Sequence, residues 1–518
     1  MSEREYGQRT FYEIYPLTFN DANGDGIGDL EGIIEKLPYI KSLGFTGLWI
    51  NPIFESAWKD GGYDIIDYFK VDKRFGTMDD ALRLIGEAHR LGFLVFFDLV
   101  PGHTSWSSPM FEKSALPTPN EYSDLYIWTD GEGKPYPKAE VNLVHGLYQR
   151  DGAYWVNFFD HQPALNYGFS RIDYPSWEKG IDSLAAEGTR KFLESVMEFW
   201  LGRGVDGFRV DMADSLVKND DDKTATIETW HRILREVHKE FPSFRMVSEW
   251  SYPERSFKAG FDSDFVLDHT DNFSHAFFRA GDGYMDPRPY EKPLLAQFDQ
   301  KLWDQYLKEM EGEMDASIKA PGHYLSLISG NHDTWRIADS LKGNSLLLAY
   351  LMIFTLPNVP FVFAGDEAGQ TTWRGLPSKE GGFQRTGARL PMKWDDSNGA
   401  FGFSKAQPAK LYLPQNPEDE TVAQREAEPL SVLNLIKALN KLRDDVPQLT
   451  RTADFSFMKW PLSYRHKDVL VAMNLKDEPV RIPVGSGEIL LAVGEHQISQ
   501  GSIVLPKHSG VVFRGDIK

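Results

Sequence analysis

Short runs of apolar and β-branched residues recur eight times along most of the chain, and segments with helical periodicity separate most of them. Runs that are apolar throughout, without alternation, are typical of parallel strands that are buried on both faces. Strands that alternate with helices favour an α/β fold, and eight such strands predict a (β/α)8 TIM barrel. The predicted strands span residues 11–16, 46–52, 94–100, 205–211, 245–250, 264–268, 325–329 and 360–364.

The segments between these runs predict helices. One uncharged stretch, 346–365, is long enough to cross a membrane, but Pro357 and Pro360 interrupt it. We therefore expect a buried helix, a turn and a buried strand there. The predicted helices include residues 30–42, 78–91, 186–201, 227–240, 293–314, 345–355 and 429–443.

Two long segments rich in Gly, Pro and polar residues follow the third and eighth runs, at 104–182 and 365–428. Both leave the barrel at the carboxyl ends of its strands, where barrel active sites are built. After Pro447 the pattern changes to short alternating strands. We assign residues 1–103 and 183–447 to a catalytic barrel, 104–182 to an inserted domain B, and 448–518 to a C-terminal antiparallel β-sandwich.

Composition narrows the possible partners. The chain of 518 residues has 76 acidic and 56 basic residues, a formal net charge of −20, which disfavours nucleic acid and anionic membranes but not a neutral ligand. Aromatic residues make up 13% of the chain and suit stacking against sugars. There is no cysteine, which excludes disulfides and thiolate metal sites. The N-terminus lacks an apolar signal core, so we expect a cytoplasmic protein.

Polar residues gather at the predicted strand ends. Arg209 and Asp211 lie two residues apart on one strand and therefore point to the same side. Glu249 ends the next strand, and Asp333 follows the seventh. Three carboxylates at one end of a barrel predict the nucleophile, the acid/base and an electrostatic stabiliser of glycosidic bond cleavage.

Roles follow from the neighbours of each carboxylate. Asp211 suits the nucleophile, because Arg209 beside it should orient it and hold its pKa low. Glu249 suits the general acid if apolar surroundings near Trp250 raise its pKa. Asp333 would stabilise positive charge on the sugar, and two histidines, His103 and His332, would donate hydrogen bonds to hydroxyls. We interpret Asp98 as a structural partner of Arg209 and not as a catalytic residue.

Four segments in order, 98–103, 207–211, 248–250 and 331–333, resemble the four sequence regions of the α-amylase superfamily (family 13) of glycoside hydrolases and transglycosylases. The resemblance covers nearly the whole chain. It implies that Asp211 is the nucleophile, Glu249 the acid/base and Asp333 the third carboxylate.

Two further segments, 60–64 and 388–396, resemble the branch of oligo-1,6-glucosidases, α-glucosidases and trehalose synthases. In that branch they close the pocket around the non-reducing sugar. The resemblance implies that Tyr63 stacks on this sugar, that Asp60 binds its hydroxyls and that Arg389 contributes to the same pocket. A blocked pocket favours exo-acting cleavage of short oligosaccharides or disaccharides.

Three positions differ from the branch. Gly102 stands where the family usually has Asn, Ala164 replaces a common Asp, and Met212 follows the nucleophile in place of a small or β-branched residue. Because the last position correlates with linkage preference in the branch, the linkage stays open.

The segment 21–29 places oxygen ligands at alternating positions with Gly at the sixth, as in the first part of an EF-hand loop. It also resembles the calcium or magnesium loop of the same branch. That resemblance implies a structural Ca²⁺ or Mg²⁺ remote from catalysis, with no organic cofactor. The implied ligands are Asp21, Asn23, Asp25, the carbonyl of Ile27 and Asp29.

The sequence favours a retaining α-glycosidase that hydrolyses short α-glucosides from the non-reducing end through a covalent glycosyl-Asp intermediate. One alternative is a transglycosylase or isomerase, such as a trehalose synthase or a sucrose-converting enzyme, with the same residues. A less favoured alternative is a non-catalytic carbohydrate-binding protein. The oligomeric state stays open.

Overall fold

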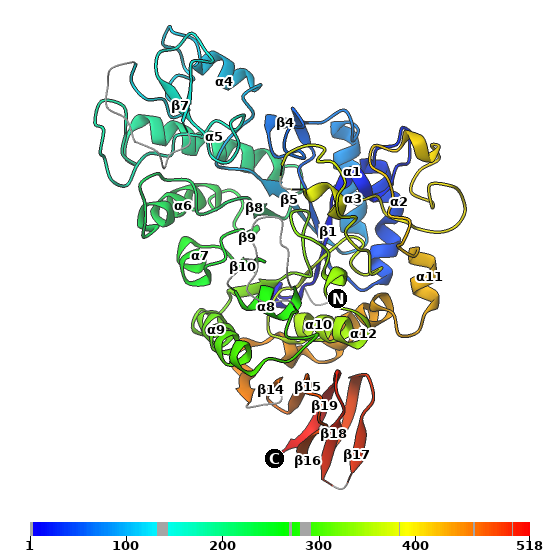
Figure 1. The fold of residues 1–518 in the computed structure, drawn as a ribbon. Helices are drawn as coiled ribbons and strands as arrows, with labels where there is room; N and C mark the ends of the chain where they lie inside the picture. The colour runs from blue at the N-terminus through cyan, green and yellow to red at the C-terminus, as the bar shows by residue number, and fades with distance from the viewer. Residues whose placement is uncertain are drawn as a thin grey trace.

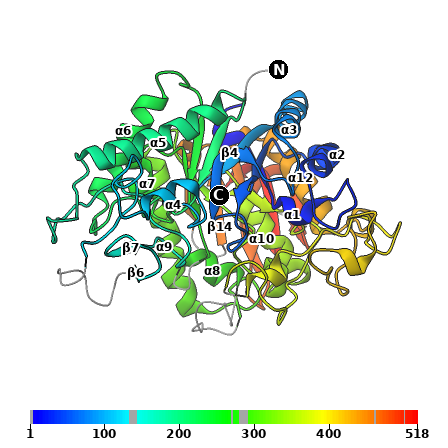
Figure 2. The same cartoon turned by 90° about the horizontal axis from the view of Figure 1, so that it is seen from above.

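The computed structural model describes residues 4–131, 143–268, 272–279, 292–382, 384–458, 462–499 and 501–518. Eight parallel strands form one sheet in the order β11-β10-β9-β8-β5-β2-β1-β12, and a bridge between Ile328 and Phe361 joins its two ends. The sheet therefore closes into a barrel surrounded by helices (Figures 1 and 2). The predicted TIM barrel is confirmed. Its strands are β1 (Phe11–Ile14), β2 (Gly47–Ile50), β5 (Leu94–Leu99), β8 (Gly207–Val210), β9 (Arg245–Ser248), β10 (Ser263–Val266), β11 (Tyr324–Leu327) and β12 (Phe361–Phe363).

The helices follow the barrel strands and lie outside them (Figure 2). The longer ones are α2 (Leu30–Ser42), α3 (Met78–Arg90), α5 (Leu184–Leu201), α6 (Thr224–Val237), α9 (Gln300–Lys319), α10 (Gly343–Thr355) and α12 (Val432–Asp445). The shorter ones are α1 (Pro16–Phe19), α4 (Pro109–Ser114), α7 (Pro253–Ala259), α8 (Phe273–Phe278) and α11 (Val422–Ala427).

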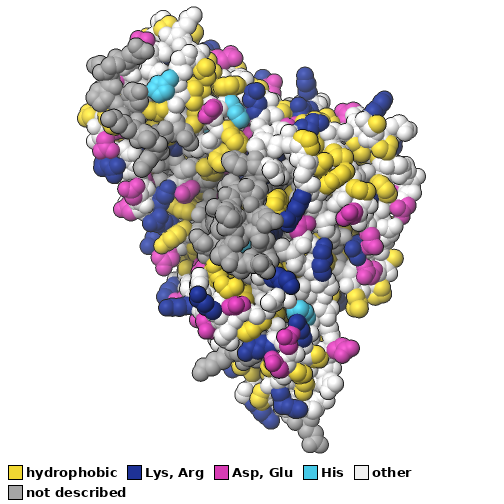
Figure 3. Space-filling view, viewed as in Figure 1, with side chains coloured by type: hydrophobic (Ala, Val, Ile, Leu, Met, Phe, Trp, Pro, Cys, Tyr) yellow, Lys and Arg dark blue, Asp and Glu magenta, His cyan; other side chains and the backbone are white. Residues whose placement is uncertain are grey.

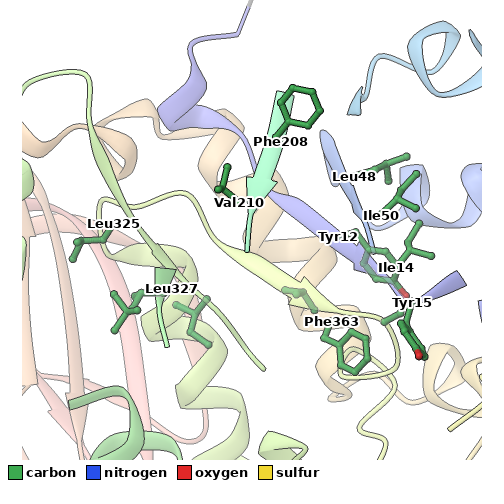
Figure 4. Close-up of a cluster of buried hydrophobic side chains, with 14 of the residues drawn as sticks. Tyr12, Ile14, Tyr15, Leu48, Ile50, Phe208, Val210, Leu325, Leu327 and Phe363 are labelled. Carbon is green, nitrogen blue, oxygen red and sulfur yellow. The ribbon is translucent and has the colours of Figure 1, made fainter. Parts of the chain in front are cut away.

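Side chains alternate between the inside and the outside of the barrel along β2 and β8, and this alternation orients the site. In β8, Phe208 and Val210 point outward into the cluster that joins strands to helices (Figure 4). In β2, Leu48 and Ile50 do the same, whereas Trp49 between them belongs to a second cluster that fills the barrel. Residues between two outward positions therefore point inward. This rule sends the side chains of 209 and 211 into the barrel.

One predicted helix begins several residues after its expected start, and one short helix was not predicted. The helix predicted over 293–314 begins at Gln300, because the Asp299 side chain caps it by accepting the N–H of Leu302, and it continues to Lys319. The short helix α7 was not predicted. It begins at a Pro and ends at Gly260, which has a φ of +99°. The uncharged stretch 346–365 forms most of α10 and then β12, as expected.

The segment between β5 and α5 carries α4 and the antiparallel pair β6 (Leu143–His145) and β7 (Ala153–Trp155). Phe111 of α4 packs against Tyr126 and Tyr154, each at a ring-centroid distance of 5.0 Å. These rings give the segment a small aromatic core of its own. It lies at the end of the molecule opposite the C-terminal strands (Figure 1).

The C-terminal unit is an antiparallel sheet of seven strands, as expected for an all-β domain. The first part of β16 pairs with β18 and its second part with β19, so β16 passes between two layers whose apolar side chains meet in one cluster. Helices α10 and α12 lie against this unit. Its strands are β13 (Phe455–Met458), β14 (Leu462–His466), β15 (Val469–Asn474), β16 (Val480–Val493), β17 (Gln497–Ser499), β18 (Ser502–Leu505) and β19 (Ser509–Ile517).

Acidic and basic side chains are interspersed on the face shown in Figure 3 and do not form a patch of one sign. Within the described ranges, no helix is long and apolar enough to cross a membrane. A short hairpin, β3 (Phe54–Ser56) with β4 (Ile65–Val71), follows β2 and carries the segment 60–64 between its strands.

Candidate active site

Each of the three predicted carboxylates lies just beyond the carboxyl end of a barrel strand. Asp211 follows β8, Glu249 follows β9, and Asp333 lies in the segment after β11. Parallel strands place these ends on one face of the barrel. The structure therefore brings together residues that are far apart in the sequence.

Arg209 joins these groups in the barrel interior, where its side chain is fully buried. Its Nη1 donates to Asp98 Oδ1 at 2.7 Å and to Asp211 Oδ1 at 3.1 Å. Its Nη2 lies 2.7 Å from Glu249 Oε1. One planar guanidinium thus orients both carboxylates expected to react and fixes them as neighbours.

The expectation that the pKa of Asp211 is held low is wrong. Burial and then the Glu249 carboxylate raise the pKa of Asp211 well above its ordinary value, and Arg209 lowers it only in part. The physical reason is that burial penalises the charged carboxylate more than the neighbouring guanidinium favours it.

Glu249 has a second fixed contact on its other oxygen. Oε2 accepts the backbone N–H of Met212 at 2.9 Å, and its side chain is 15% exposed. Met212 has a φ of +40°, which turns its N–H toward Glu249 immediately after the predicted nucleophile. Trp250 is buried and lines the same cavity.

Asp333 lies among cationic groups. His332 Nε2 is 3.0 Å from Asp333 Oδ2, and Arg385 and Arg389 both donate to Oδ1. Burial alone would raise the pKa of Asp333, but His332 and the two arginines outweigh burial and hold it well below its usual range. Burial likewise opposes the charge on His332, yet Asp333 and Glu13 raise its pKa. Asp333 is thus held as a carboxylate.

Tyr63 forms one wall of the site. Its ring lies parallel to His332 at a centroid distance of 5.0 Å, and its hydroxyl donates to Asp98 Oδ2 at 2.9 Å. Asn51 Nδ2 contacts both the Tyr63 hydroxyl and His332 Nδ1. The orientation of the tyrosine ring is therefore fixed from two sides.

His103 is held by the hairpin and by the inserted segment. Its Nε2–H donates to the carbonyl of Tyr63 at 3.1 Å, and burial lowers its pKa to about 4, so it stays neutral near pH 7. Asn157 Nδ2 lies 3.4 Å from His103 Nδ1. A Cβ on Gly102 would lie 2.5 Å from Asn157 Nδ2. The amide of Asn157 thus occupies the space next to the glycine that replaces the usual Asn.

Arg385 is a site residue that the sequence reasoning missed. It joins Asp333 to Asp60, whose other oxygen accepts from Gln162 at 2.7 Å. Arg389 instead donates to Asp333 at 2.7 Å and to the carbonyl of 332 at 2.6 Å. Among the described residues, Arg385 lines the cavity, whereas Arg389 is not part of the lining and contacts Asp333. The sequence offered one sign of this role: Arg385 lies four residues before Arg389, which was predicted to contribute to the pocket.

The carboxylates surround one cavity of about 390 Å³, a size that suits a small ligand. Most of its ionisable lining residues are acidic. Within the part of the chain that the structure describes, it is lined by Asp60, Tyr63, His103, Phe158, Asp211, Met212, Asp214, Glu249, Trp250, Leu267, Asp268, Asn331, Asp333, Thr334 and Arg385.

The predicted ion loop precedes α2, away from this cavity. Its oxygens accept N–H groups of the loop itself: Asp21 from residues 24 and 26, Asn23 from 25, and Asp25 from Ile27. Asp29 accepts from residues 22 and 23 and caps α2. The residue types fit Ca²⁺ or Mg²⁺, but no three acidic or histidine side chains of the described ranges group as an ion site. A bound ion stays a prediction.

Residues 13–452 match the model of the alpha-amylase family, described as alpha amylase, catalytic domain. The chain is 32% identical over 441 residues to the trehalose synthase/amylase TreS of Mycolicibacterium smegmatis, covering 78% of this chain and 69% of that protein. It is 30% identical over 496 residues to the oligo-1,6-glucosidase of Parageobacillus thermoglucosidasius, covering 83% and 82%.

Solved structures share the fold along the whole chain. The trehalulose synthase from Pseudomonas mesoacidophila aligns with a TM-score of 0.77 over 99% of this chain and 100% of its own, at 23% identity. Together with the match over residues 13–452, these relatives show that the chain belongs to the alpha-amylase family, in the branch of the oligo-1,6-glucosidase and trehalose synthase relatives.

Proposed function

We propose that this enzyme is a retaining α-glycosidase that hydrolyses short α-glucosides from the non-reducing end. One observation carries the proposal: the guanidinium of Arg209 contacts Asp211 at 3.1 Å and Glu249 at 2.7 Å. In a retaining enzyme two carboxyl groups flank a single anomeric carbon, about 5 Å apart. Two carboxylates held on one guanidinium support this arrangement.

The reaction would have two steps. In the first, Asp211 attacks the anomeric carbon while Glu249 gives its proton to the leaving oxygen, so the glycosidic bond breaks and a glycosyl ester forms. In the second, Glu249 takes a proton from water, which attacks the same carbon and releases Asp211. The first step therefore needs Asp211 ionised and Glu249 protonated.

Asp333 would stabilise the positive charge that develops on the sugar ring. Its three cationic partners keep it ionised, with a pKa well below the usual range despite burial. The same contacts place Arg385 between Asp333 and Asp60, at one side of the cavity. Polar groups in this arrangement suit the hydroxyls of a terminal sugar, which supports cleavage from the non-reducing end.

The cavity also favours neutral substrates. Six of its described lining residues are acidic: Asp60, Asp211, Asp214, Glu249, Asp268 and Asp333. A phosphorylated or carboxylated sugar would meet like charges there and bind weakly. Neutral di- and oligosaccharides with α-linked glucose are therefore the expected substrates.

A second candidate is a transglycosylase or isomerase with the same residues, because one relative is named a trehalose synthase/amylase. In that case the glycosyl group on Asp211 passes to a sugar hydroxyl in place of water. Product analysis with maltose, isomaltose, sucrose and trehalose separates the two. We expect net glucose release, whereas a new disaccharide without net glucose release would favour the isomerase.

The same assay tests the role of the nucleophile. Asp211→Asn should lower kcat by at least about 10³-fold on each cleaved sugar, as loss of a covalent nucleophile does. Asp214→Asn is the matched control, since Asp214 lines the same cavity at the next acidic position but has Lys223 as its partner. Equal activity of wild type and Asp211→Asn would contradict the proposal.

A further inference from the structure

The segment that carries Glu249 is irregular and short. Residues 249–252 connect the end of β9 to α7, and Ser251 has a φ of +55°, a conformation that L residues rarely adopt. Such a backbone persists only when its surroundings hold it. The surroundings here consist mainly of one buried side chain, Asp264 of β10.

Asp264 is 1% exposed and accepts four hydrogen bonds, three from this segment and one from Ser248 just before it. Its Oδ1 accepts from Ser248 Oγ at 2.6 Å and from the N–H groups of Trp250 and Ser251 at 3.2 and 3.3 Å. Its Oδ2 accepts from the N–H of Tyr252 at 2.8 Å. The donors lie on both sides of Glu249 in the sequence.

We propose that Asp264 is a positioning residue for Glu249: its carboxylate fixes the backbone on both sides of the acid/base and so sets where that proton is delivered. The inference rests on the proposed function. Asp264 is absent from the described lining of the cavity, so it acts through the backbone and not on the sugar.

Three further contacts support this role. Ser248 Oγ also contacts Ser256 Oγ at 2.6 Å, which ties the strand end to α7. The hydroxyl of Ser251 donates to the carbonyl of residue 265 and accepts the N–H of residue 267, so β10 holds the segment from a second side. Burial raises the pKa of Asp264 to about 7, against the effect of its four donors. The four hydrogen bonds offset part of the cost of burying this carboxylate, and they rigidify the backbone that donates them.

The test compares substrates whose leaving groups need different amounts of acid help: phenyl α-glucoside needs most, 4-nitrophenyl α-glucoside less, and α-glucosyl fluoride almost none. Asp264→Asn keeps the shape but replaces one acceptor oxygen by a donor. We expect kcat/KM on phenyl α-glucoside to fall about 10- to 100-fold, as misplacement of a catalytic group does. On α-glucosyl fluoride the fall should stay below about threefold, because attack by Asp211 needs no acid there.

Asp262→Asn is the matched control. Asp262 joins the same two strands at their other end, where it accepts from the N–H of Met246 and from Arg245. Its variant should leave the ratio of kcat/KM between phenyl α-glucoside and α-glucosyl fluoride unchanged. A change of that ratio in Asp262→Asn equal to the change in Asp264→Asn would overturn the proposal.

If Asp264→Asn does not fold, Ser248→Ala removes one of the four donors and should give the same dependence on leaving group at about threefold size. An equal loss on all three substrates in either variant would mean general damage and overturn the role of Asp264. A wild-type protein without turnover on any of the three would instead contradict the proposed function.

Discussion

Arg209 contacts three carboxylates and orients the two that are proposed to react. Its guanidinium lies 2.7 Å from Asp98, 2.7 Å from Glu249 and 3.1 Å from Asp211. Burial and then Glu249 raise the pKa of Asp211, and Arg209 opposes this only in part. The first step of retaining hydrolysis requires an ionised nucleophile, so Arg209 supports the proposed role of Asp211 by opposing the rise of its pKa.

Gly102 lacks the side chain of the Asn that the family usually has, and Asn157 from the inserted segment occupies the space beside it. Gly102→Ala places a Cβ 2.5 Å from Asn157 Nδ2, and Asn157 is also held by Lys218 Nζ at 3.0 Å. We expect Gly102→Ala to lower the free energy of unfolding by about 1–3 kcal/mol, as overpacking does. Combining it with Asn157→Ala should recover most of the loss in a thermal unfolding experiment.

Gly188→Ala is the control for this prediction. Gly188 lies in α5, and a Cβ added there would have no neighbouring atom within 4 Å. The substitution should stabilise by about 0.5–1 kcal/mol through helix propensity. A destabilisation by Gly102→Ala that persists unchanged without the Asn157 side chain would contradict the contact.

At the scale of elements, the strands were predictable because most of their residues are apolar, and each of the eight predicted runs overlaps a barrel strand, although β10 and β11 begin one residue before the predicted start. The C-terminal strands were harder: β16 is one strand from Val480 to Val493, although Gly485 and Gly487 interrupt its pattern. Its bends lie at register shifts in the pairing with β19. Such irregularities depend on the partner strand and leave little trace in the sequence.

The candidate site likewise contains residues that the sequence could predict and residues that it could not. Asp211, Glu249 and Asp333 could be predicted because they end strands, and strand ends meet on one face. Arg385 lies in a 3-10 turn within a long loop, and Asp264 lies inside a strand among apolar neighbours. Their roles depend on tertiary contacts, to Asp60 and to the segment 249–252, that no local pattern encodes.

The loop before α2 is the element for which an ion is predicted. Its carboxylates already order the loop, and Ca²⁺ would add ligand bonds to Asp21, Asp25 and Asp29. Because a ligand that binds only the folded state stabilises it, Ca²⁺ should raise Tm and a chelator should reverse the gain. Asp25→Ala should abolish the response, whereas Asp222→Ala, in another exposed acidic loop, should retain it. A Tm that changes with neither Ca²⁺ nor Mg²⁺ would contradict the prediction.

At the scale of the whole molecule, the C-terminal sheet is anchored to the barrel through buried polar contacts. His466 Nε2–H donates to the carbonyl of Thr355 at the end of α10 at 2.8 Å, and Tyr464 contacts the hydroxyl of Thr355 at 2.6 Å. Burial disfavours a positive charge on the His466 ring, so protonation of His466 would destabilise this buried contact region. The stability of the contact between the barrel and the C-terminal sheet should therefore depend on pH.

Burial lowers the pKa of His466 to about 4 in the folded protein, below its ordinary value of 6.5. Between pH 6.5 and 4 the unfolded chain therefore binds a proton that the folded chain does not, and stability falls as the pH falls. His466→Gln should reduce this slope in chemical unfolding experiments at several pH values. An unchanged slope would show that His466 is not the group responsible.

The central claim is that one sugar carbon is attacked twice, first by Asp211 and then by water. The stereochemistry of the first product tests it most directly, because two displacements restore the original configuration and one inverts it. Proton NMR during cleavage of 4-nitrophenyl α-glucoside should show α-glucose first, with the β-anomer appearing only through mutarotation. β-Glucose as the first product would contradict the account.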